Sequence, residues 1–140
     1  MTASNTRSLP PYALALDMEA SKQDGASPLI TMPFGNKVQG RPGFLHGGAI
    51  SGLLEMAAIA AIHTALAKQG DDAPIKQVNV TIDFMRGGKS ETTYAAGVIT
   101  RLGRTMANVS AHAWQDDPGS IIAQAQMHYL ISRGKDGQEA

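Results

Sequence analysis

One carboxylate is notable in the sequence because its neighbours are almost entirely apolar. Glu55 is the only charged residue (Asp, Glu, Lys or Arg) among the 21 residues of Gly47–Ala67, a run rich in alanine and glycine. Burying a carboxylate without a partner is costly, and desolvation raises its pKa toward the range that suits a general base. A carboxylate tied to backbone donors, paired with a neighbouring subunit or pointing at solvent would give the same pattern. Glu55 is therefore a candidate catalytic residue with a structural alternative.

The residues that begin this run could stabilise negative charge. Gly47 and Gly48 fall where the first N–H groups of a helix have no helical partner and where the helix dipole is positive. Glycine lets a ligand approach the backbone closely, so a carbonyl oxygen gaining charge would be held there as in an oxyanion hole. His46 directly precedes them, although a histidine near a helix start is more often structural. These residue types point to chemistry at a carbonyl group.

Composition argues against several other functions. The 12 basic and 12 acidic residues cancel, which argues against a nucleic-acid partner. The chain has no cysteine, so it can form neither a thiolate zinc site nor a cysteine nucleophile. No serine-centred elbow motif is present. His112 and His128 fall on different expected strands without the spacing of metal ligands, so we expect no metal site.

The apolar run is expected to form one long central helix. Apolar residues recur at three- and four-residue spacing, at Ile50, Leu53, Leu54, Ala57, Ala58, Ala61, Ile62 and Ala65. Lys68, Gln69 and Gly70 provide the usual stop chemistry, a cation followed by a glycine. The run is long enough to cross a bilayer, but a carboxylate near its middle favours a helix buried inside a soluble protein. We therefore expect no membrane span.

The remaining sequence predicts strands. Extended stretches at about Ala13–Ser21 and Pro28–Phe34 flank a turn at Asp24-Gly25 and suggest a hairpin. Val78, Val80, Ile82 and Phe84 alternate with polar residues as in a half-buried strand. Turn signals separate further runs near 91–101, 105–115 and 120–132, with lengths that suit antiparallel hairpins. The pattern predicts an α+β fold, one sheet curled around one helix.

The chain is expected to be one domain spanning residues 1–140, with residues 1–9 as a loose N-terminal arm. The N-terminal residues contain no apolar run that could form the core of a signal peptide. We therefore expect a cytoplasmic protein.

The stretch 43–58, GFLHGGAISGLLEMAA, resembles the hotdog-fold acyl-CoA thioesterases of the PaaI-like type. Members of that family carry His-Gly-Gly at the start of the central helix and an acid nine residues after the histidine, as His46 and Glu55 are here. The stretch 80–86, VTIDFMR, and the later Gly103-Arg104 also resemble a strand and a turn of the family. The resemblance covers about residues 30–132, nearly the whole domain.

This resemblance implies a hydrolase that cleaves an acyl-CoA thioester. The backbone N–H of Gly47 would polarise the thioester carbonyl, and Glu55 would reach in from the partner subunit as general base or nucleophile. His46 would help to shape the loop and contact substrate or water, and Gly48 would border the bound substrate. The family forms dimers or dimers of dimers with active sites between subunits, and it needs no metal or bound cofactor; coenzyme A is part of the substrate.

The sequence departs from the family at one position. Many relatives carry Asn or Gln six residues before the histidine, where this chain has Gly40. Gln39, or Asn36 further back, could supply the missing amide from a shifted loop. Some members also use a residue on the strand after the helix, often a hydroxyl, for which Gln77 is the best match here.

Several cations could hold the phosphates of coenzyme A or could simply be solvated charges at strand ends. These are Arg86, Lys89, Arg101 and Arg104, with Arg104 beside the Gly103 turn as the first choice. A carrier-protein thioester could replace the CoA ester.

Three other functions remain open at this stage. A non-catalytic acyl-CoA-binding protein is compatible with the Gly40 departure. A related hydratase would place a histidine well before the helix acid, and the loop 35–45 has none. A structural oligomer would simply pair Glu55 at an interface.

Overall fold

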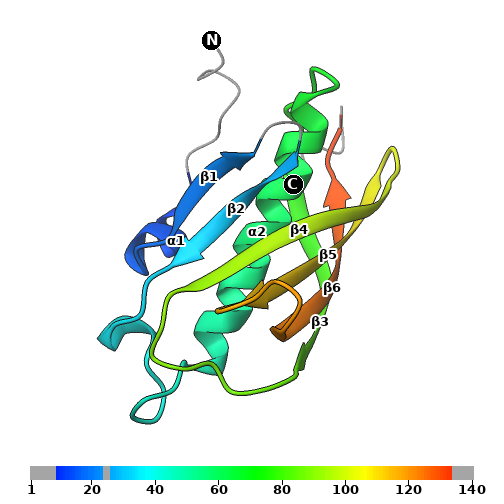
Figure 1. Cartoon of the computed structure of the whole chain (residues 1–140). Coiled ribbons are helices and arrows are strands. Elements are labelled where there is room, and N and C mark those ends of the chain that lie inside the picture. The colour runs from blue at the N-terminus through cyan, green and yellow to red at the C-terminus, as the bar shows by residue number, and fades with distance from the viewer. Residues whose placement is uncertain (1–8, 24–25, 134–140) are drawn as a thin grey trace.

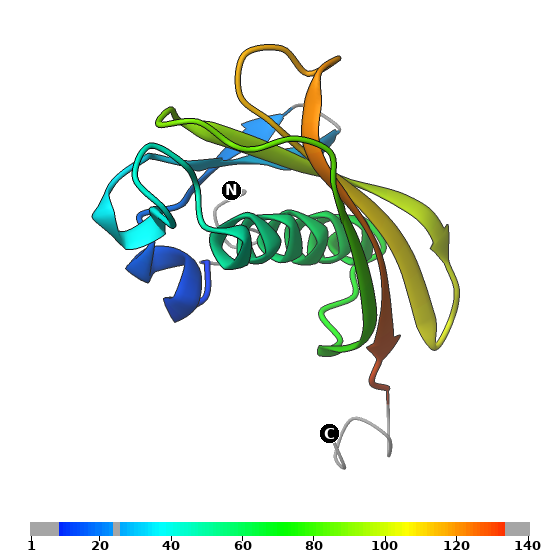
Figure 2. The ribbon, with the colours of Figure 1, turned by 90° about the horizontal axis from the view of Figure 1, so that it is seen from below.

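The computed structural model of the protein describes residues 9–23 and 26–133. Within this part of the chain a six-stranded sheet curls around one long helix, as Figures 1 and 2 show. The elements in chain order are α1 (Pro11–Ala15), β1 (Glu19–Gln23), β2 (Ala26–Met32), the 3-10 helix η2 (Asn36–Val38), α2 (Gly47–Ala67), β3 (Ile75–Phe84), β4 (Thr93–Leu102), β5 (Met106–Trp114) and β6 (Ile121–Ile131).

Neighbouring strands of the sheet are antiparallel throughout, in the order β1-β2-β4-β5-β6-β3. The β1–β2 hairpin forms one edge, and β3, which follows α2 in the chain, forms the opposite edge. Strands β4, β5 and β6 fill the middle and confirm the three runs expected near 91–101, 105–115 and 120–132. The sheet lies over one side of α2 (Figure 2), and this confirms the predicted α+β hotdog fold.

Helix α2 has the bounds that its apolar pattern predicts. It begins after His46 and ends before Lys68, and Gly70 then adopts a positive φ of 70°, which suits the turn that follows the helix. The helix is long and apolar enough to cross a membrane, with a mean hydropathy of 1.6. Its apolar side chains are nevertheless buried beneath the sheet, as expected for the core helix of a domain. Leu53, Leu54 and Ala57 are each 0% exposed.

Small side chains bring α2 very close to the sheet. A Cβ on Gly97, in the middle of β4, would lie 2.8 Å from the backbone oxygen of Ala57 and 2.9 Å from the Cβ of Ala61. The neighbouring positions of the inner sheet face are also small and buried, at Ala95, Ala111, Ala113, Ala123 and Ala125. The helix therefore packs backbone to backbone against β4 and excludes anything larger there.

The N-terminal region differs from the sequence-based prediction. The hairpin is confirmed by antiparallel pairing of β1 with β2, but residues 11–15 form helix α1 and not an extended strand. Pro11 suits the first turn of a helix, and Ala and Leu favour its continuation. The predicted Asp24-Gly25 turn and the arm at 1–8 lie outside the described residues, whereas Leu9 packs against the core.

Strand β3 also differs from a simple alternation. Val80 and Ile82 pack against the core as predicted, but Val78 is 59% exposed and Phe84 is 54% exposed. A bulge between Gln77 and Asn79 shifts the register with β6 and takes Val78 out of the inward-facing series. Phe84, at the end of the strand, lies instead against the start of α2: a Cβ on Gly47 would be 3.7 Å from its ring.

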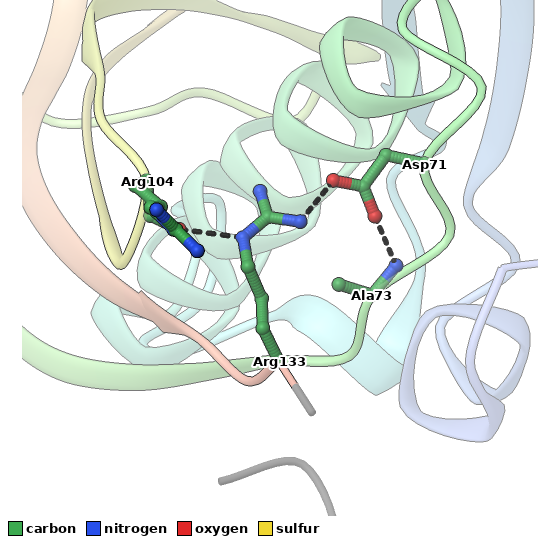
Figure 3. A network of polar contacts seen from close by, with 4 residues as sticks. All are labelled: Asp71, Ala73, Arg104 and Arg133. Carbon is green, nitrogen blue, oxygen red and sulfur yellow. Dashed lines mark hydrogen bonds and ion pairs between the residues drawn. The ribbon is translucent and has the colours of Figure 1, made fainter. Parts of the chain in front are cut away.

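A network of polar contacts joins three segments of the chain near the C-terminal end of α2 (Figure 3). The Arg133 guanidinium pairs with the Asp71 carboxylate and also donates to the backbone oxygen of Arg104 at 2.6 Å. Asp71 in turn accepts the N–H of Ala73 at 2.9 Å. The hydrogen bond from Arg133, with that from Ala73, lowers the pKa of Asp71. These contacts join the end of β6 to the α2–β3 connection and to the β4–β5 turn.

We expect Gly97→Ala to destabilise the protein by about 1–3 kcal/mol, because the added methyl group meets helix backbone and cannot be relieved by a rotamer change. Urea unfolding followed by circular dichroism would measure the change. Gly35→Ala is the matched control, since no atom lies within 4 Å of its Cβ position and its φ of 179° is open to any residue. A Gly97→Ala variant as stable as the control would show that the helix can withdraw from the sheet without cost.

Candidate active site

The start of α2 presents a free backbone donor. The His46 ring caps the helix, because its Nδ1 accepts the N–H of Gly48 at 2.8 Å, and the His46 carbonyl accepts the N–H groups of Ala49 and Ile50 at 3.0 and 3.1 Å. Within the described residues, the N–H of Gly47 donates no hydrogen bond. It is therefore available at the positive end of the helix for a ligand oxygen.

A tightly bonded loop sets the direction in which this donor points. The N–H of His46 donates to the Val38 carbonyl at 2.8 Å, and that of Leu45 donates to the Gly88 carbonyl at 2.9 Å. Gly43 turns the loop with a positive φ of 85°. Figure 2 shows this loop, with η2 and α1, beside the start of α2. The loop is tied to both neighbouring segments, so the free N–H has a fixed orientation.

The same loop contains Gly40, the position that lacks the family's amide, and Gln39, one of the two residues predicted to replace it. The Gln39 side chain accepts the N–H of Gly43 at 3.1 Å, so its oxygen braces the loop itself. A Cβ on Gly40 would lie 3.1 Å from the Cα of His46, closer than an ordinary contact. The loop is therefore packed for glycine at position 40, and a longer side chain there would push against the backbone of His46.

Glu55 lies on α2 in a half-buried position. Burial raises the pKa of Glu55, and a side-chain hydrogen bond from Gln77 partly offsets that rise. The structure therefore brings together two residues that the sequence analysis singled out separately, one on the helix and one on β3.

A residue that the sequence analysis did not select lies behind this pair. Tyr129 on β6 is 1% exposed and pairs directly with Gln77 across the β3–β6 ladder. The Nε2 of Gln77 lies 3.3 Å from the Tyr129 hydroxyl. Burial, with a smaller contribution from the charge of Glu55, raises the pKa of Tyr129 to about 12. The link between this tyrosine and the site depends on the register of β3 with β6. Hydrophobic alternation in the sequence does not reveal that register.

A second tyrosine approaches the acid from α1. A Cβ on Gly52 would lie 2.2 Å from the Tyr12 hydroxyl, so the ring rests directly on the helix one turn before Glu55. Burial and the negative charge of Glu55 raise the pKa of Tyr12. The sequence analysis missed this residue because it expected an extended strand from about residue 13, whereas residues 11–15 form helix α1, which carries Tyr12.

The proposed phosphate-binding cations separate into two groups. Arg86 follows β3, and its N–H bonds to the Ile122 carbonyl at 3.2 Å, near Phe84 and the helix start. Lys89 forms an isolated antiparallel β-bridge with Phe44, in the loop before α2. The guanidinium carbon of Arg41 lies 4.3 Å from the centre of the Phe44 ring. Arg104 lies at the opposite end of the domain, beside Asp71 and Arg133 (Figure 3). Within one chain, Arg104 is therefore far from Gly47.

The helix spacing separates the free donor from the acid within one chain. Gly47 and Glu55 are eight residues apart on α2, which corresponds to about 12 Å along the helix axis. A carbonyl oxygen bonded to the Gly47 N–H would then lie too far from the Glu55 carboxylate of the same chain for direct reaction.

In the residues that the structure describes, no three acidic or histidine side chains form a group that could hold a metal ion.

Comparison with known proteins identifies the family. Residues 42–122, more than half of the chain, match the model of the thioesterase superfamily. The protein therefore belongs to the thioesterase superfamily. No curated protein sequence matches the chain.

Solved structures show the same fold at low sequence identity. A phenylacetic acid degradation-related protein from Ralstonia eutropha JMP134 has 20% identity and a TM-score of 0.76, over 89% of this chain and 92% of that one. A thioesterase family protein from Silicibacter pomeroyi has 20% identity and a TM-score of 0.77, over 89% and 91%. A Bacillus halodurans protein solved with CoA has 18% identity and a TM-score of 0.79, over 94% and 85%.

We expect Glu55→Gln to stabilise the protein at neutral pH. Because the fold raises the pKa of Glu55, the native state holds its proton more tightly than the unfolded chain. The free energy of unfolding therefore falls as pH rises above the unfolded pKa of about 4.3. Glutamine does not ionise and avoids that loss. The free energy of unfolding of the variant should therefore be larger than that of the wild type at pH 7.5, and the two values should be closer at pH 4. Urea unfolding at both pH values tests this. A variant that is less stable at pH 7.5 would instead indicate a structurally paired carboxylate.

Proposed function

We propose that the protein is an acyl-CoA thioesterase that hydrolyses its substrate to a free carboxylic acid and coenzyme A. The observation that carries the proposal is the N–H of Gly47 at the start of α2, which donates no hydrogen bond to any residue that the structure describes, in a member of the thioesterase superfamily. The raised pKa of Glu55 on the same helix supports it, because a carboxylate of increased basicity suits proton removal from water.

In the proposed reaction the thioester oxygen accepts the N–H of Gly47, which stabilises the charge that develops there. Glu55 removes a proton from water, and the resulting hydroxide attacks the carbonyl carbon. The tetrahedral intermediate collapses, the carbon–sulfur bond breaks, and the thiolate of coenzyme A takes up the proton. In a second route the Glu55 carboxylate attacks the carbonyl carbon directly, the carbon–sulfur bond breaks, and the coenzyme A thiolate leaves and takes up a proton. Water then hydrolyses the resulting anhydride to the free acid and regenerates the Glu55 carboxylate.

The proposed site needs two copies of the chain. Donor and acid are about 12 Å apart on one helix, so we propose that Gly47 of one subunit meets Glu55 of another in a homodimer or a dimer of dimers. The edge strand β3 supports this assembly, since Val78, Phe84 and the adjacent Met85 are exposed apolar residues at 59%, 54% and 47%.

The CoA part of the substrate has chemical support at the same end of α2. Arg41, Arg86 and Lys89 are exposed cations in the segments around the helix start, where they could contact phosphate groups. The CoA-bound Bacillus halodurans structure supports the ligand class. In this proposal Arg104 contributes only if it comes from another subunit.

A non-catalytic acyl-CoA-binding protein is the second candidate. Gly40 provides no amide, and the side-chain oxygen of Gln39 is used on Gly43, so that oxygen is not free to orient water. This candidate predicts tight binding of an acyl-CoA without thiol release.

The first experiment offers the protein a panel of aromatic and straight-chain acyl-CoAs and follows thiol release with a thiol-reactive dye. The chain has no cysteine, so it adds no background signal. Release by the wild type should fall about 100-fold or more in Glu55→Gln, in line with the loss of a general base. If no acyl-CoA is cleaved but some protect the protein against heat, the binding candidate replaces the enzyme.

Gly47→Pro should remove the oxyanion donor without breaking the helix. Proline is tolerated at the first helical position, and His46 already has the extended backbone that precedes a proline, with φ −71° and ψ 133°. We expect kcat to fall about 100- to 1,000-fold. Gly47→Ala is the control, because it keeps the N–H and its methyl group meets Phe84 at an ordinary 3.7 Å. Equal activity of the two variants would contradict the role of this N–H.

Mixing Glu55→Gln with Gly47→Pro tests the two-subunit site. If donor and acid come from different chains, each mixed dimer has one intact site, and an equal mixture regains about a quarter of wild-type activity. If both groups come from one chain, every site carries a defect and no activity returns. Co-refolding the two variants, with each alone as control, provides the measurement.

A further inference from the structure

The side chain of Gln115, directly after β5, forms hydrogen bonds that the proposed reaction does not use. They all go to the segment 89–93, where the connection from β3 enters β4. The Oε1 of Gln115 accepts the N–H of Lys89 at 3.0 Å, and its Nε2 donates to the Lys89 carbonyl at 3.0 Å. The Nε2 also lies 3.3 Å from the Glu91 carbonyl and 3.1 Å from the Thr93 hydroxyl. One half-buried side chain therefore holds a segment that is distant in the sequence.

The backbone partners determine the orientation of this amide. A main-chain N–H can only donate and a main-chain carbonyl can only accept. The amide oxygen must therefore face the Lys89 N–H, and the NH2 group must face the carbonyls of Lys89 and Glu91. Thr93, which is 0% exposed, donates its hydroxyl proton to the Glu91 carbonyl at 3.4 Å and accepts from Gln115. A flipped amide would place like groups against each other, so both ends are fixed by the backbone.

The connection that is held in this way is bonded on its other side to the loop before α2. The Gly88 carbonyl accepts the N–H of Leu45 at 2.9 Å, and Lys89 forms its isolated antiparallel bridge with Phe44. The two segments are in close contact, because a Cβ on Gly88 would lie 2.5 Å from the Cδ1 of Leu45. Leu45 is 7% exposed and stands two residues before Gly47. The position of the connection therefore bears on the direction of the Gly47 N–H.

The connection between β3 and β4 depends on other elements for its position. Apart from the bridge at Lys89 it has no regular structure. Its start is held where the N–H groups of Met85 and Arg86 donate to the Ile122 carbonyl at 2.8 and 3.2 Å. Gln115 holds its other end. Loss of that amide would free the stretch between these two attachments, which is the stretch that contacts the loop before α2.

We propose that Gln115 is a positioning residue for the oxyanion donor: its amide holds the β3–β4 connection, which in turn holds the loop that orients the N–H of Gly47. The inference rests on the proposed function, which gives that N–H its catalytic role. Gln115 acts through the backbone that it holds and is not itself a catalytic residue. A displacement of about 1 Å in a reacting group can cost about 100-fold in rate, so contacts that fix this loop control the reaction.

The first test compares Gln115→Met with Gln126→Met. Methionine keeps the length of the side chain and removes the amide. Gln126, on β6, is a matched control because its side-chain oxygen accepts the Ser110 hydroxyl at 3.1 Å, elsewhere in the sheet. We expect kcat to fall about 10- to 100-fold in Gln115→Met and to stay within about twofold of wild type in Gln126→Met. An unchanged kcat in Gln115→Met would overturn the proposal.

A double variant separates positioning from stability. In a Gly47→Pro background the donor is already absent, so Gln115→Met should change kcat by no more than about twofold there. A general loss of stability would instead lower the activity of both backgrounds by the same factor. An equal loss in the two backgrounds therefore refutes the positioning role.

Amide hydrogen exchange measures the contact without activity. NMR of the full-length protein labelled with nitrogen-15 follows the N–H of Leu45, which bonds to Gly88, and that of Ala111 in the middle of β5. Gln115→Met should accelerate exchange at Leu45 about fivefold or more, the size of one ordinary hydrogen bond. Exchange at Ala111 should not change. A Leu45 amide that exchanges as in the wild type, or equal acceleration at both amides, overturns the proposal.

The two proposals can fail separately. If no acyl-CoA is hydrolysed but exchange at Leu45 accelerates in Gln115→Met, the proposed function is wrong and the positioning of the Gly47 N–H stands. If hydrolysis occurs and neither kcat nor exchange responds to the substitution, the positioning role is wrong and the proposed function stands. Should Gln115→Met not fold, Gln115→Ala removes the amide and adds no atom. That variant must then accelerate exchange at Leu45, or the proposal fails.

Discussion

The close contact between α2 and β4 is the constraint from which most of the architecture follows. Gly97 lies against the backbone of Ala57, so the sheet can curl tightly around the helix only where both surfaces are made of small residues. This explains why so long a helix is rich in alanine, and why it is buried under β2, β4 and β5. The faces that pack most tightly have no room for polar side chains, so a functional carboxylate must lie on the remaining side.

That remaining side is where β3 and β6 meet the helix through side chains. Among the strands that the structure describes, β3 is an edge strand that pairs with β6 alone. Its Gln77 lies 3.3 Å from the Tyr129 hydroxyl, and a hydrogen bond from Gln77 limits the rise in the pKa of Glu55. The acid is thus half-buried: desolvated enough for its pKa to rise, yet close to the surface at which another molecule can arrive. The N–H of Gly47 lies at the start of the same helix, eight residues before Glu55. Separation of the two groups by a rigid helix is what makes a partner necessary for the proposed chemistry.

Much of this could be predicted from the sequence, for identifiable reasons. Helix α2 was predictable to the residue because its cap, its apolar spacing and its stop signal agree, and the strands after it are bounded by Gly and Pro turns. Helix α1 was not predicted, although Pro11, Ala and Leu all suit a helix, because its five residues are too few to show the apolar spacing that identifies α2. The exposed Val78 depends on a bulge that alternation does not reveal. Tyr129 and Tyr12 reach the acid through strand register and packing, which are properties of the folded chain and not of any local motif.

The cap that His46 makes also fixes the chemistry of its ring. Since Nδ1 accepts the N–H of Gly48, the capping ring is the tautomer that carries its proton on Nε2. The exposed edge of the imidazole then offers a hydrogen-bond donor, and it has no lone pair free to remove a proton from water. The start of the helix is accordingly a region of donors alone, the ring N–H beside the backbone N–H of Gly47. In the proposed reaction the base has to come from elsewhere, and Glu55 is the group that we propose for it.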